Sequence, residues 1–448
     1  MNDRLKFNLR SLAVAALLAI PLDAQQLTIS LQDALARAEQ YGGQIQTANI
    51  AARLAREDVK QAQAARLPTA NGLNQFIYTE GNGTPSGVFV ANDGVHVYNE
   101  QLTGRQDLLA LIRGGSVHQM QAAEAVARAK ADVAARGLRA TVIQDYYGIA
   151  DAQRKVDNAK RSLQEAQNFL SITQKQEQGG EVARADVVKA QIQVQQRQRD
   201  LQDAELALEK AKITLGVLIF PALREDYNIV DDMSQLPGLP TLEEATTVAT
   251  ANSPDLRAAQ ATVNEARSGV TVAKYAYLPS LDLEVFYGIN ANQFLATTYG
   301  GTFETGRSTF PAVQTPVRQN LGYSAQATLN IPLWDWGSIH SKVKQASMRE
   351  EQAKLDLSLA QRQLQAGLRS AYQEAKTALS QLQSLQSSSS LSEDSLRLTL
   401  LRYQAGEATA LEVVDAQSTA SLARNAYDDG LLRYRVAMAN LQALTGSF

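Results

Sequence analysis

The chain has no cysteine in 448 residues, which excludes disulfides, thiolate metal sites, cysteine nucleophiles and a lipid anchor on an N-terminal cysteine. Histidine is nearly as scarce, with only His96, His118 and His340. His118 and His340 each follow a glycine by three residues and have no second ligand at metal-binding spacing, so a structural role at a helix start is favoured. Because catalytic and phosphate-binding motifs are also missing, we expect no enzyme, no cofactor and no metal.

Aromatic residues make up only 6% of the chain, which is 45% hydrophobic and rich in alanine, glutamine and leucine. This composition is typical of long packed helices rather than of a compact enzyme core. The 43 basic and 46 acidic residues are spread evenly and leave a net charge of −3. No basic stripe could hold a phosphate backbone, so nucleic acid is not expected as a partner.

Long apolar runs are missing as well. Residues 1–24 contain basic residues, a twelve-residue apolar run and small residues near Ala24, which is the layout of a secretory signal peptide. A buried amphipathic helix is the alternative interpretation. The run is too short to span a bilayer and no other run reaches 18 apolar residues, so the sequence predicts export without a membrane-spanning helix.

An internal duplication decides the architecture. Three segments recur in the same order: 29–70 on 240–281, 110–125 on 332–347, and 178–191 on 404–417. We therefore predict a first repeat at 25–216, a connector at 217–240 and a second repeat at 241–448. Each repeat contains a helix ended by a proline (Pro68 or Pro279), two strands and a long helical hairpin.

The strands are clearest in the second repeat. Segments 281–290 and 321–333 alternate apolar and polar residues, which indicates strands with one apolar and one polar face. Their partners in the first repeat, near 70–80 and 95–108, alternate poorly and are placed by the duplication. The sequence thus predicts four strands, two in each repeat.

The helices that follow the strands are very long. From Ser338 to about Arg402 the chain has no proline and would extend roughly 95 Å as one helix. Apolar residues on this helix and on the two return helices are spaced as in a heptad repeat, which predicts helices packed side by side. The seam of the first of them consists of Leu364, Leu368, Ala371, Ala375, Ala378, Leu382 and Leu385.

A two-faced strand suits either a sandwich or a membrane barrel. Four strands make only a small sandwich core and leave two open edges, which lipid does not tolerate. A barrel assembled from several chains resolves both problems, and strands of ten to thirteen residues suit a tilted crossing. The long loops at 80–95 and 290–320 would then lie at the mouth away from the helices.

The duplicated order, the "PLWDWG" joint before a long helix and the "YQAGEATALEVVDAQ" hairpin resemble the TolC-like outer-membrane efflux family, in its unlipidated branch. The resemblance covers the chain from about residue 27 to its end. It implies a mainly α fold with a β membrane portion. In that fold a homotrimer forms a twelve-stranded outer-membrane β-barrel, four strands per chain, which continues as a periplasmic α-helical barrel. It also implies a periplasmic adaptor (membrane fusion) protein and an inner-membrane pump of RND or ABC type as partners, besides outer-membrane lipid.

Two groups of residues are candidates for contact sites. Trp334 and Trp336 stand where strand becomes helix and fit the aromatic girdle of a barrel, although a packed joint explains either one equally well. The hairpin turns are the points farthest from the barrel. They need glycine to end a helix and are also candidates for docking the adaptor. These tip residues are Gly179, Gly180, Glu181, Gly406 and Glu407.

A third group follows the second tip. Thr409 and Glu412 have the spacing of a capping box, so Glu412 has a structural explanation, whereas Asp415 lies beyond the cap. The resemblance implies that Glu412 and Asp415 form a luminal acidic ring, with Tyr403 as the aromatic residue near the gate. It also places a basic partner four residues before Glu412, where this chain has Ala408, so no ionic lock is expected from that position.

The sequence therefore favours a passive exit duct for small toxic compounds in a tripartite efflux system. A duct for type I protein secretion is the alternative within the same architecture. A periplasmic adaptor would have one hairpin flanked by β domains, and a purely structural coiled coil would not contain the alternating strands. We expect an outer-membrane protein of a Gram-negative-type bacterium with a long periplasmic extension.

Overall fold

The computed structural model describes residues 27–78, 96–222, 224–291 and 321–446. The predicted signal peptide and most of the two predicted loops lie outside these residues. The first repeat contains β1 (Leu27–Ile29), α1 (Leu31–Tyr41), α2 (Gly43–Ala64), β2 (Thr69–Tyr78), β3 (His96–Asp107), α3 (Leu108–Arg113), α4 (Gly115–Gln178) and α5 (Arg184–Ile219). After β4 (Tyr227–Ile229), the second contains α6 (Leu242–Asn252), α7 (Pro254–Tyr275), β5 (Ser280–Ala291), β6 (Leu321–Asn330), α8 (Ser338–Gln404) and α9 (Ala410–Thr445).

The first predicted helix of each repeat is in fact two helices. In the first repeat the break is at Gly42, where an added Cβ would lie 2.7 Å from the Leu138 side chain. In the second it is at Ser253, because the following Pro254 has no N–H to continue the hydrogen-bond ladder. The helix is therefore interrupted at the equivalent place in both repeats, but by different residues.

The four predicted strands form one antiparallel sheet in the order β2-β3-β5-β6. The two central strands join the repeats, and the two outer strands are edges. The register places Tyr287 opposite Tyr323 and Val285 opposite Ala325 on one face, and Glu284 opposite Gln326 on the other. Large apolar side chains on the first face are exposed, including Phe76, Leu102, Val285, Tyr287, Tyr323 and Leu329. This face is unpartnered in a single chain.

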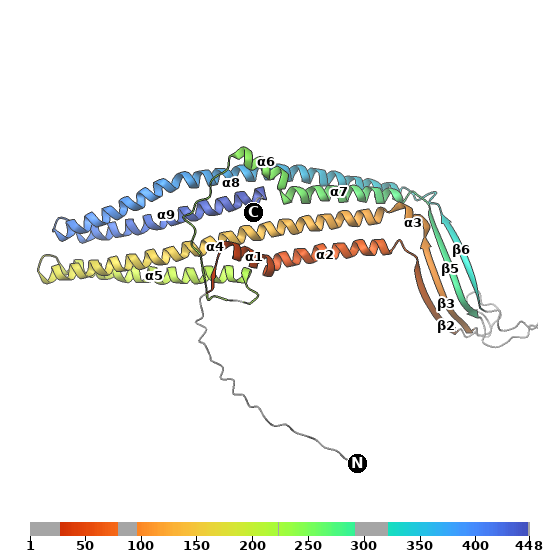
Figure 1. The fold of residues 1–448 in the computed structure, drawn as a ribbon, viewed down its shortest axis with the longest axis horizontal. Coiled ribbons are helices and arrows are strands. Elements are labelled where there is room, and N and C mark those ends of the chain that lie inside the picture. Colours follow the sequence, from red (N-terminus) through yellow and green to blue (C-terminus); the bar gives the residue numbers. More distant parts are fainter. Residues whose placement is uncertain (1–26, 79–95, 223, 292–320, 447–448) are drawn as a thin grey trace, which may run out of the picture.

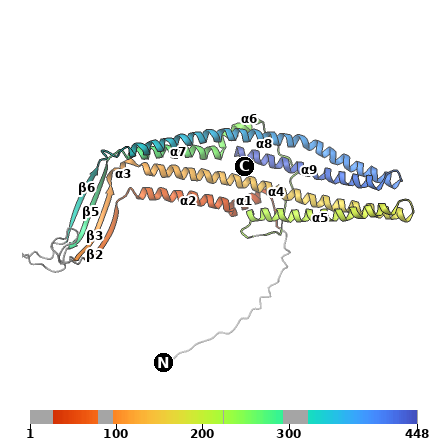
Figure 2. The ribbon, with the colours of Figure 1, turned by 180° about the vertical axis from the view of Figure 1, so that it is seen from behind.

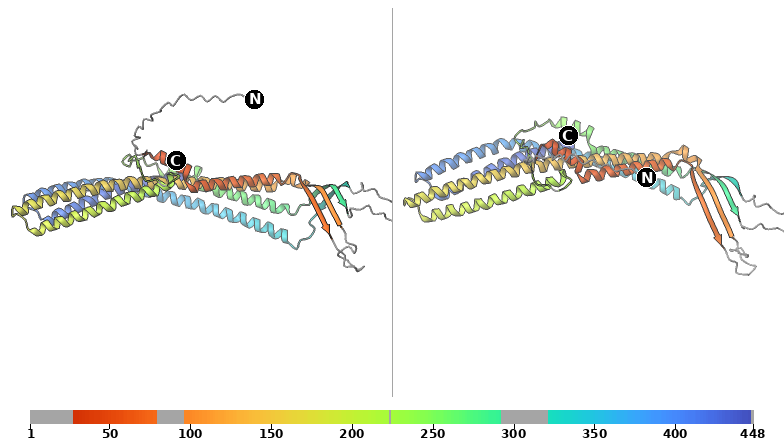
Figure 3. Two further views of the ribbon diagram at one scale, coloured as in Figure 1. Left: turned by 90° about the horizontal axis from the view of Figure 1, so that it is seen from below. Right: turned by 60° about the horizontal axis from the view of Figure 1, so that its bottom comes forward.

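The helices form an extended layer that continues from the sheet (Figure 1). α4 has 64 residues and α8 has 67, as the uninterrupted sequence predicted. Next to the sheet the neighbours are α2, α4, α7 and α8 in that order. Toward the tips they are α5, α4, α9 and α8, seen from behind in Figure 2. Both hairpin tips lie at the end of the layer opposite the sheet, as the views in Figure 3 also show.

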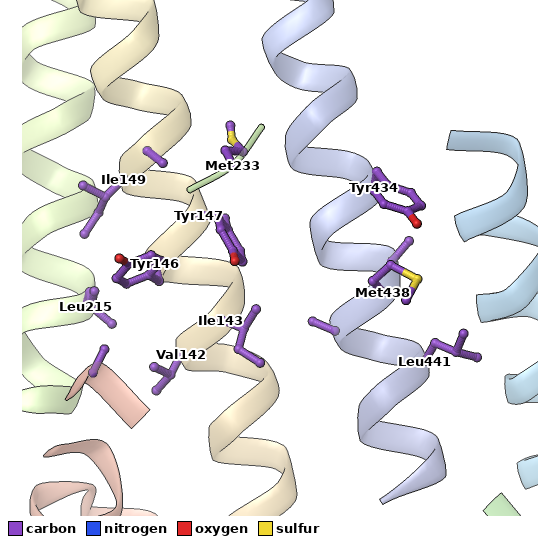
Figure 4. Close-up of a cluster of buried hydrophobic side chains, with 14 of the residues drawn as sticks. Val142, Ile143, Tyr146, Tyr147, Ile149, Leu215, Met233, Tyr434, Met438 and Leu441 are labelled. Atoms are coloured by element: carbon purple, nitrogen blue, oxygen red, sulfur yellow. The ribbon is translucent and has the colours of Figure 1, made fainter. Parts of the chain in front are cut away.

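The main core lies near the middle of the layer, where the shorter helices end (Figure 1), and Figure 4 shows some of its side chains. The predicted seam of α8 is confirmed, since Leu364, Leu368, Ala375, Ala378 and Leu382 are all buried. Two buried tyrosines fasten the connector between the repeats to this core. The Tyr146 hydroxyl donates to the Val230 carbonyl at 2.7 Å, and the Tyr434 hydroxyl donates to the Pro237 carbonyl at 2.5 Å. These bonds leave neither hydroxyl without a partner inside the core.

Charged side chains join the two hairpins between this core and the hairpin tips. Arg424 on α9 has a side chain only 7% exposed. Its guanidinium donates to both carboxylate oxygens of Glu165 on α4, at 2.7 and 3.4 Å, and to Glu393 on α8 at 2.8 Å. Arg161 on α4 also pairs with Glu393 at 3.2 Å. Three helices from both hairpins are thus tied together by one alternating set of charges.

Sequence reasoning missed two small features. The short helix α3 follows β3, whereas the second repeat has Pro332 near this place and no helix before Ser338. The strands β1 and β4 form a separate parallel pair, which attaches the connector to the segment just before α1. None of the described helices contains a stretch apolar enough and long enough to cross a membrane.

Candidate functional site

The two hairpin tips have the same backbone. Gly180 and Gly406 both have a φ of 76°, in the left-handed region that favours glycine. At the first tip Gly180 N donates to Glu177 O at 3.0 Å and Glu181 N donates to Gln176 O at 2.8 Å. The second tip repeats this pair of bonds with Gly406 and Glu407. Each is a Schellman motif, which satisfies the last carbonyls of a long helix.

Gly179 differs from its neighbour. Its φ is −77°, and an added Cβ would meet nothing closer than 3.5 Å. A side chain is therefore tolerated at Gly179, whereas at Gly180 and Gly406 it would be strained even though the space beside them is open. Only one glycine of the Gly179–Gly180 pair is needed for the turn.

The two hairpins meet near the tips through a small buried cluster. Tyr403 is 2% exposed, and its ring packs edge-on against Phe169 with centroids 5.1 Å apart. Its hydroxyl donates to the Thr173 hydroxyl oxygen at 3.2 Å, and burial raises the pKa of the Tyr403 phenol. In a single chain this residue packs α8 against α4 and is not part of an exposed surface. Tyr403 is therefore placed to hold the hairpins together.

Glu412 caps the start of α9. The Thr409 hydroxyl accepts from Glu412 N at 3.3 Å, and the Glu412 carboxylate accepts from Thr409 N at 3.2 Å. The same carboxylate lies 3.6 Å from the Arg402 guanidinium, across the hairpin turn. Arg402 is therefore a basic partner of Glu412, although position 408 is an alanine. It was missed because it comes from the preceding helix rather than from the residues just before Glu412.

Asp415 lies one turn further along α9 and is exposed. Its carboxylate makes no hydrogen bond or ion pair with the described part of the chain, although its backbone carbonyl accepts from the Thr419 hydroxyl. The helix start thus explains Glu412 and leaves Asp415 without a structural role.

The joint between β6 and α8 is held by Asp335. Its carboxylate accepts from Gly337 N at 3.0 Å and from Ile339 N, so it satisfies amides at the helix start. The flanking Trp334 and Trp336 are 75% and 89% exposed, with ring centroids 5.6 Å apart. Neither indole is packed into the joint.

Trp336 is also strained. Its φ is 55°, and among the described residues it is the only non-glycine residue with a positive φ. The equivalent residue of the first repeat is Gly114, also at 55°. A tryptophan at this position costs about 1–2 kcal/mol relative to glycine and buries little within the chain. Contacts inside one chain do not explain its presence, which supports a role at an external surface.

Replacing Trp336 with glycine tests this role. We expect the stability of the protein in detergent to rise by about 1 kcal/mol because the backbone strain is relieved. If the external surface is lipid, as the resemblance implies, milder detergent should also extract the variant from membranes. Thermal unfolding and a detergent series measure the two effects. Lower stability in detergent would instead show that Trp336 packs against another part of the assembly.

The comparisons with known proteins agree with this architecture. A family described as Outer membrane efflux protein matches residues 246–447. The outer membrane protein TolC of Escherichia coli (strain K12) is 24% identical over 182 residues, which is 41% of this chain. That match spans 35% of the length of TolC.

Solved structures match almost the whole chain. The CmeC outer membrane channel of Campylobacter jejuni has a TM-score of 0.75 and 16% identity, covering 93% of this chain and 85% of that one. The MtrE outer membrane channel of Neisseria gonorrhoeae has a TM-score of 0.72 and 21% identity, covering 93% and 88%.

The fold is therefore that of these outer-membrane channels. The second repeat matches the outer membrane efflux protein family, and the resemblance to TolC-like proteins that the sequence motifs predicted is confirmed. The predicted fold class and outer-membrane location are confirmed, and a trimeric barrel is consistent with these neighbours.

Proposed function

We propose that the protein is the outer-membrane exit duct of a tripartite efflux system and passively conducts small toxic compounds. One observation carries the proposal. The four-stranded sheet has an exposed apolar face and two open edges, and it continues directly into a periplasmic layer of helices. Such a sheet is stable in lipid only when its edges are closed.

Several copies joined edge to edge close the sheet, and we propose three, the number that the resemblance to the TolC-like family implies. The free edges of each chain are β2 and β6 in the sheet, and α2 with α5 and α8 in the helical layer. Joining the β6 edge of one chain to the β2 edge of the next gives a twelve-stranded barrel. The same contact brings the helical edges together, so the pore of the barrel would continue through the periplasm.

The barrel is tested by extraction and labelling. Isolated outer membranes should yield a detergent-extractable trimer. Cysteines at Leu283 and Tyr323 should react with lipid-soluble reagents, and cysteines at Glu284 and Gln326 with water-soluble ones, because the register puts the two pairs on opposite faces. The absence of native cysteine makes each label unambiguous. A soluble periplasmic monomer, or the reversed labelling pattern, would contradict the proposal.

The tips supply the contact with the other components. We propose that Gly179, Gly180, Glu181, Gly406 and Glu407 form a docking surface for a periplasmic adaptor, which connects the duct to an inner-membrane pump of RND or ABC type. Type I protein secretion uses the same kind of duct and remains the alternative. Drug sensitivity after deletion supports efflux, and loss of one secreted protein with normal drug resistance supports secretion.

The acidic residues of α9 would select cations at the entrance. Three copies of exposed Asp415 around one axis would attract cations to the opening. In planar bilayers Asp415→Ala should weaken cation preference and block by multivalent cations added from the periplasmic side. The trimer should keep its stability because the Asp415 carboxylate has no bond to lose.

Glu412→Gln separates charge from capping. Glutamine can still complete the capping box, so thermal stability should fall by less than about 1 kcal/mol while the charge and the Arg402 contact are lost. If Asp415→Ala leaves selectivity unchanged and Glu412→Gln alters only stability, both carboxylates are structural and the constriction lies elsewhere.

A further inference from the structure

A groove near the middle of the helical layer contains an unpaired charge. It has a volume of about 460 Å³ and lies between α5 and α9, with α4 between them. Its apolar lining comes from small and branched side chains, among them Ala211, Leu432 and Val436, with Gly148 on α4. Figure 4 shows the core next to it, with Tyr146 and Leu215. This volume lies within the range of small-molecule sites in proteins.

The other charged side chains that line the groove are already paired. Asp429 binds Lys155 at 2.6 Å. Arg433 donates to Glu374 at 2.6 Å and to Gln381 at 3.1 Å. Their charges are therefore largely compensated inside the chain.

Asp145 is different. It is half-buried in the groove and makes no hydrogen bond or ion pair with the described residues, and burial raises the pKa of its carboxyl group. A carboxylate that is partly removed from water without a partner is destabilised, and a cation beside it would restore the lost interaction. The groove thus combines apolar surface with one uncompensated negative charge.

We propose that this groove binds a monovalent organic cation with an apolar body, whose positive charge pairs with Asp145. The apolar part of the ligand contacts Ala211, Leu432 and Val436, and the open side of the groove lets it enter from solvent. The site is in the wall of the helical layer, distinct from the tips and from the entrance residues Glu412 and Asp415. It does not depend on the efflux function.

Tetraphenylphosphonium is a suitable probe because it is a permanent cation with an apolar surface, and tetraphenylborate is its anionic counterpart of the same shape. Binding of each to the full-length protein in nanodiscs is measured by equilibrium dialysis. The wild type should bind the phosphonium at least tenfold more tightly than Asp145→Asn does. The borate should gain nothing from Asp145. Asp157→Asn on α4 makes the same charge change at an exposed position outside the groove and should bind like the wild type.

A second variant removes the space instead of the charge. Thr214→Trp fills the groove from α5 and should abolish phosphonium binding, while the circular dichroism spectrum and trimer stay unchanged. Asp145→Asn should unfold at the same temperature as the wild type or higher, because the lost carboxylate had no partner. Equal phosphonium binding by wild type and Asp145→Asn would overturn the proposal. Wild-type protein that binds the borate as tightly as the phosphonium would also overturn it, as would a wild-type trimer that does not bind the phosphonium.

Discussion

Replacing Arg424 with methionine should destabilise the periplasmic hairpins by about 3 kcal/mol. Removing one partner from a buried set of charges typically costs about 3–5 kcal/mol, because the remaining carboxylates lose their counter-charge. The lower end applies because Glu393 is 45% exposed and keeps Arg161 as a partner. Thermal melting of the helices, followed by circular dichroism, measures the loss.

Arg397→Met is the matched control. Arg397 lies on α8 and pairs with Asp394 at 3.4 Å, but both side chains are more than 60% exposed. An exposed pair of this kind contributes less than about 1 kcal/mol, so the control should melt close to the wild type. Arg424→Lys keeps the charge but not the bidentate contact with Glu165, so its melting temperature should lie between those of Arg424→Met and the control. If Arg424→Met melts like the control, the charge cluster does not join the hairpins.

Replacing Gly180 or Gly406 with valine should abolish efflux while trimers still reach the outer membrane. A β-branched residue is strained at a φ of 76°, so the tip must change shape, and the cost of about 1–2 kcal/mol is too small to unfold helices of this length. Growth in the presence of toxic compounds and the amount of trimer in membrane fractions are the two measurements.

Gly179→Val provides the control at the adjacent position. Its φ of −77° accepts a side chain and its surroundings have room, so the turn should be kept. Normal efflux in this variant with loss in Gly180→Val would assign the effect to the shape of the tip. Loss of the trimer itself in Gly180→Val would favour a capping role alone. Full efflux in both tip variants would exclude the tips as a docking surface.

Much of the architecture was encoded locally. The duplication, the alternation in β5 and β6, and the heptad seam of α8 are short-range patterns, and each predicted its element because the period of apolar residues depends on the geometry of that element. The tip glycines were found for the same reason, since a left-handed residue after a helix is a local requirement. The breaks at Gly42 and Ser253 also have local signals, a glycine pair and a following proline, but they were missed.

The contacts between distant segments were decided only by the tertiary structure. Arg402 lies near Glu412 because the hairpin folds back on itself, and Arg424 meets Glu165 because α9 packs against a helix from the other repeat. The burial of Tyr403 and the unpaired state of Asp145 likewise depend on which helices are neighbours. A charged residue in a sequence has many possible partners, and only packing selects one of them or leaves it with none.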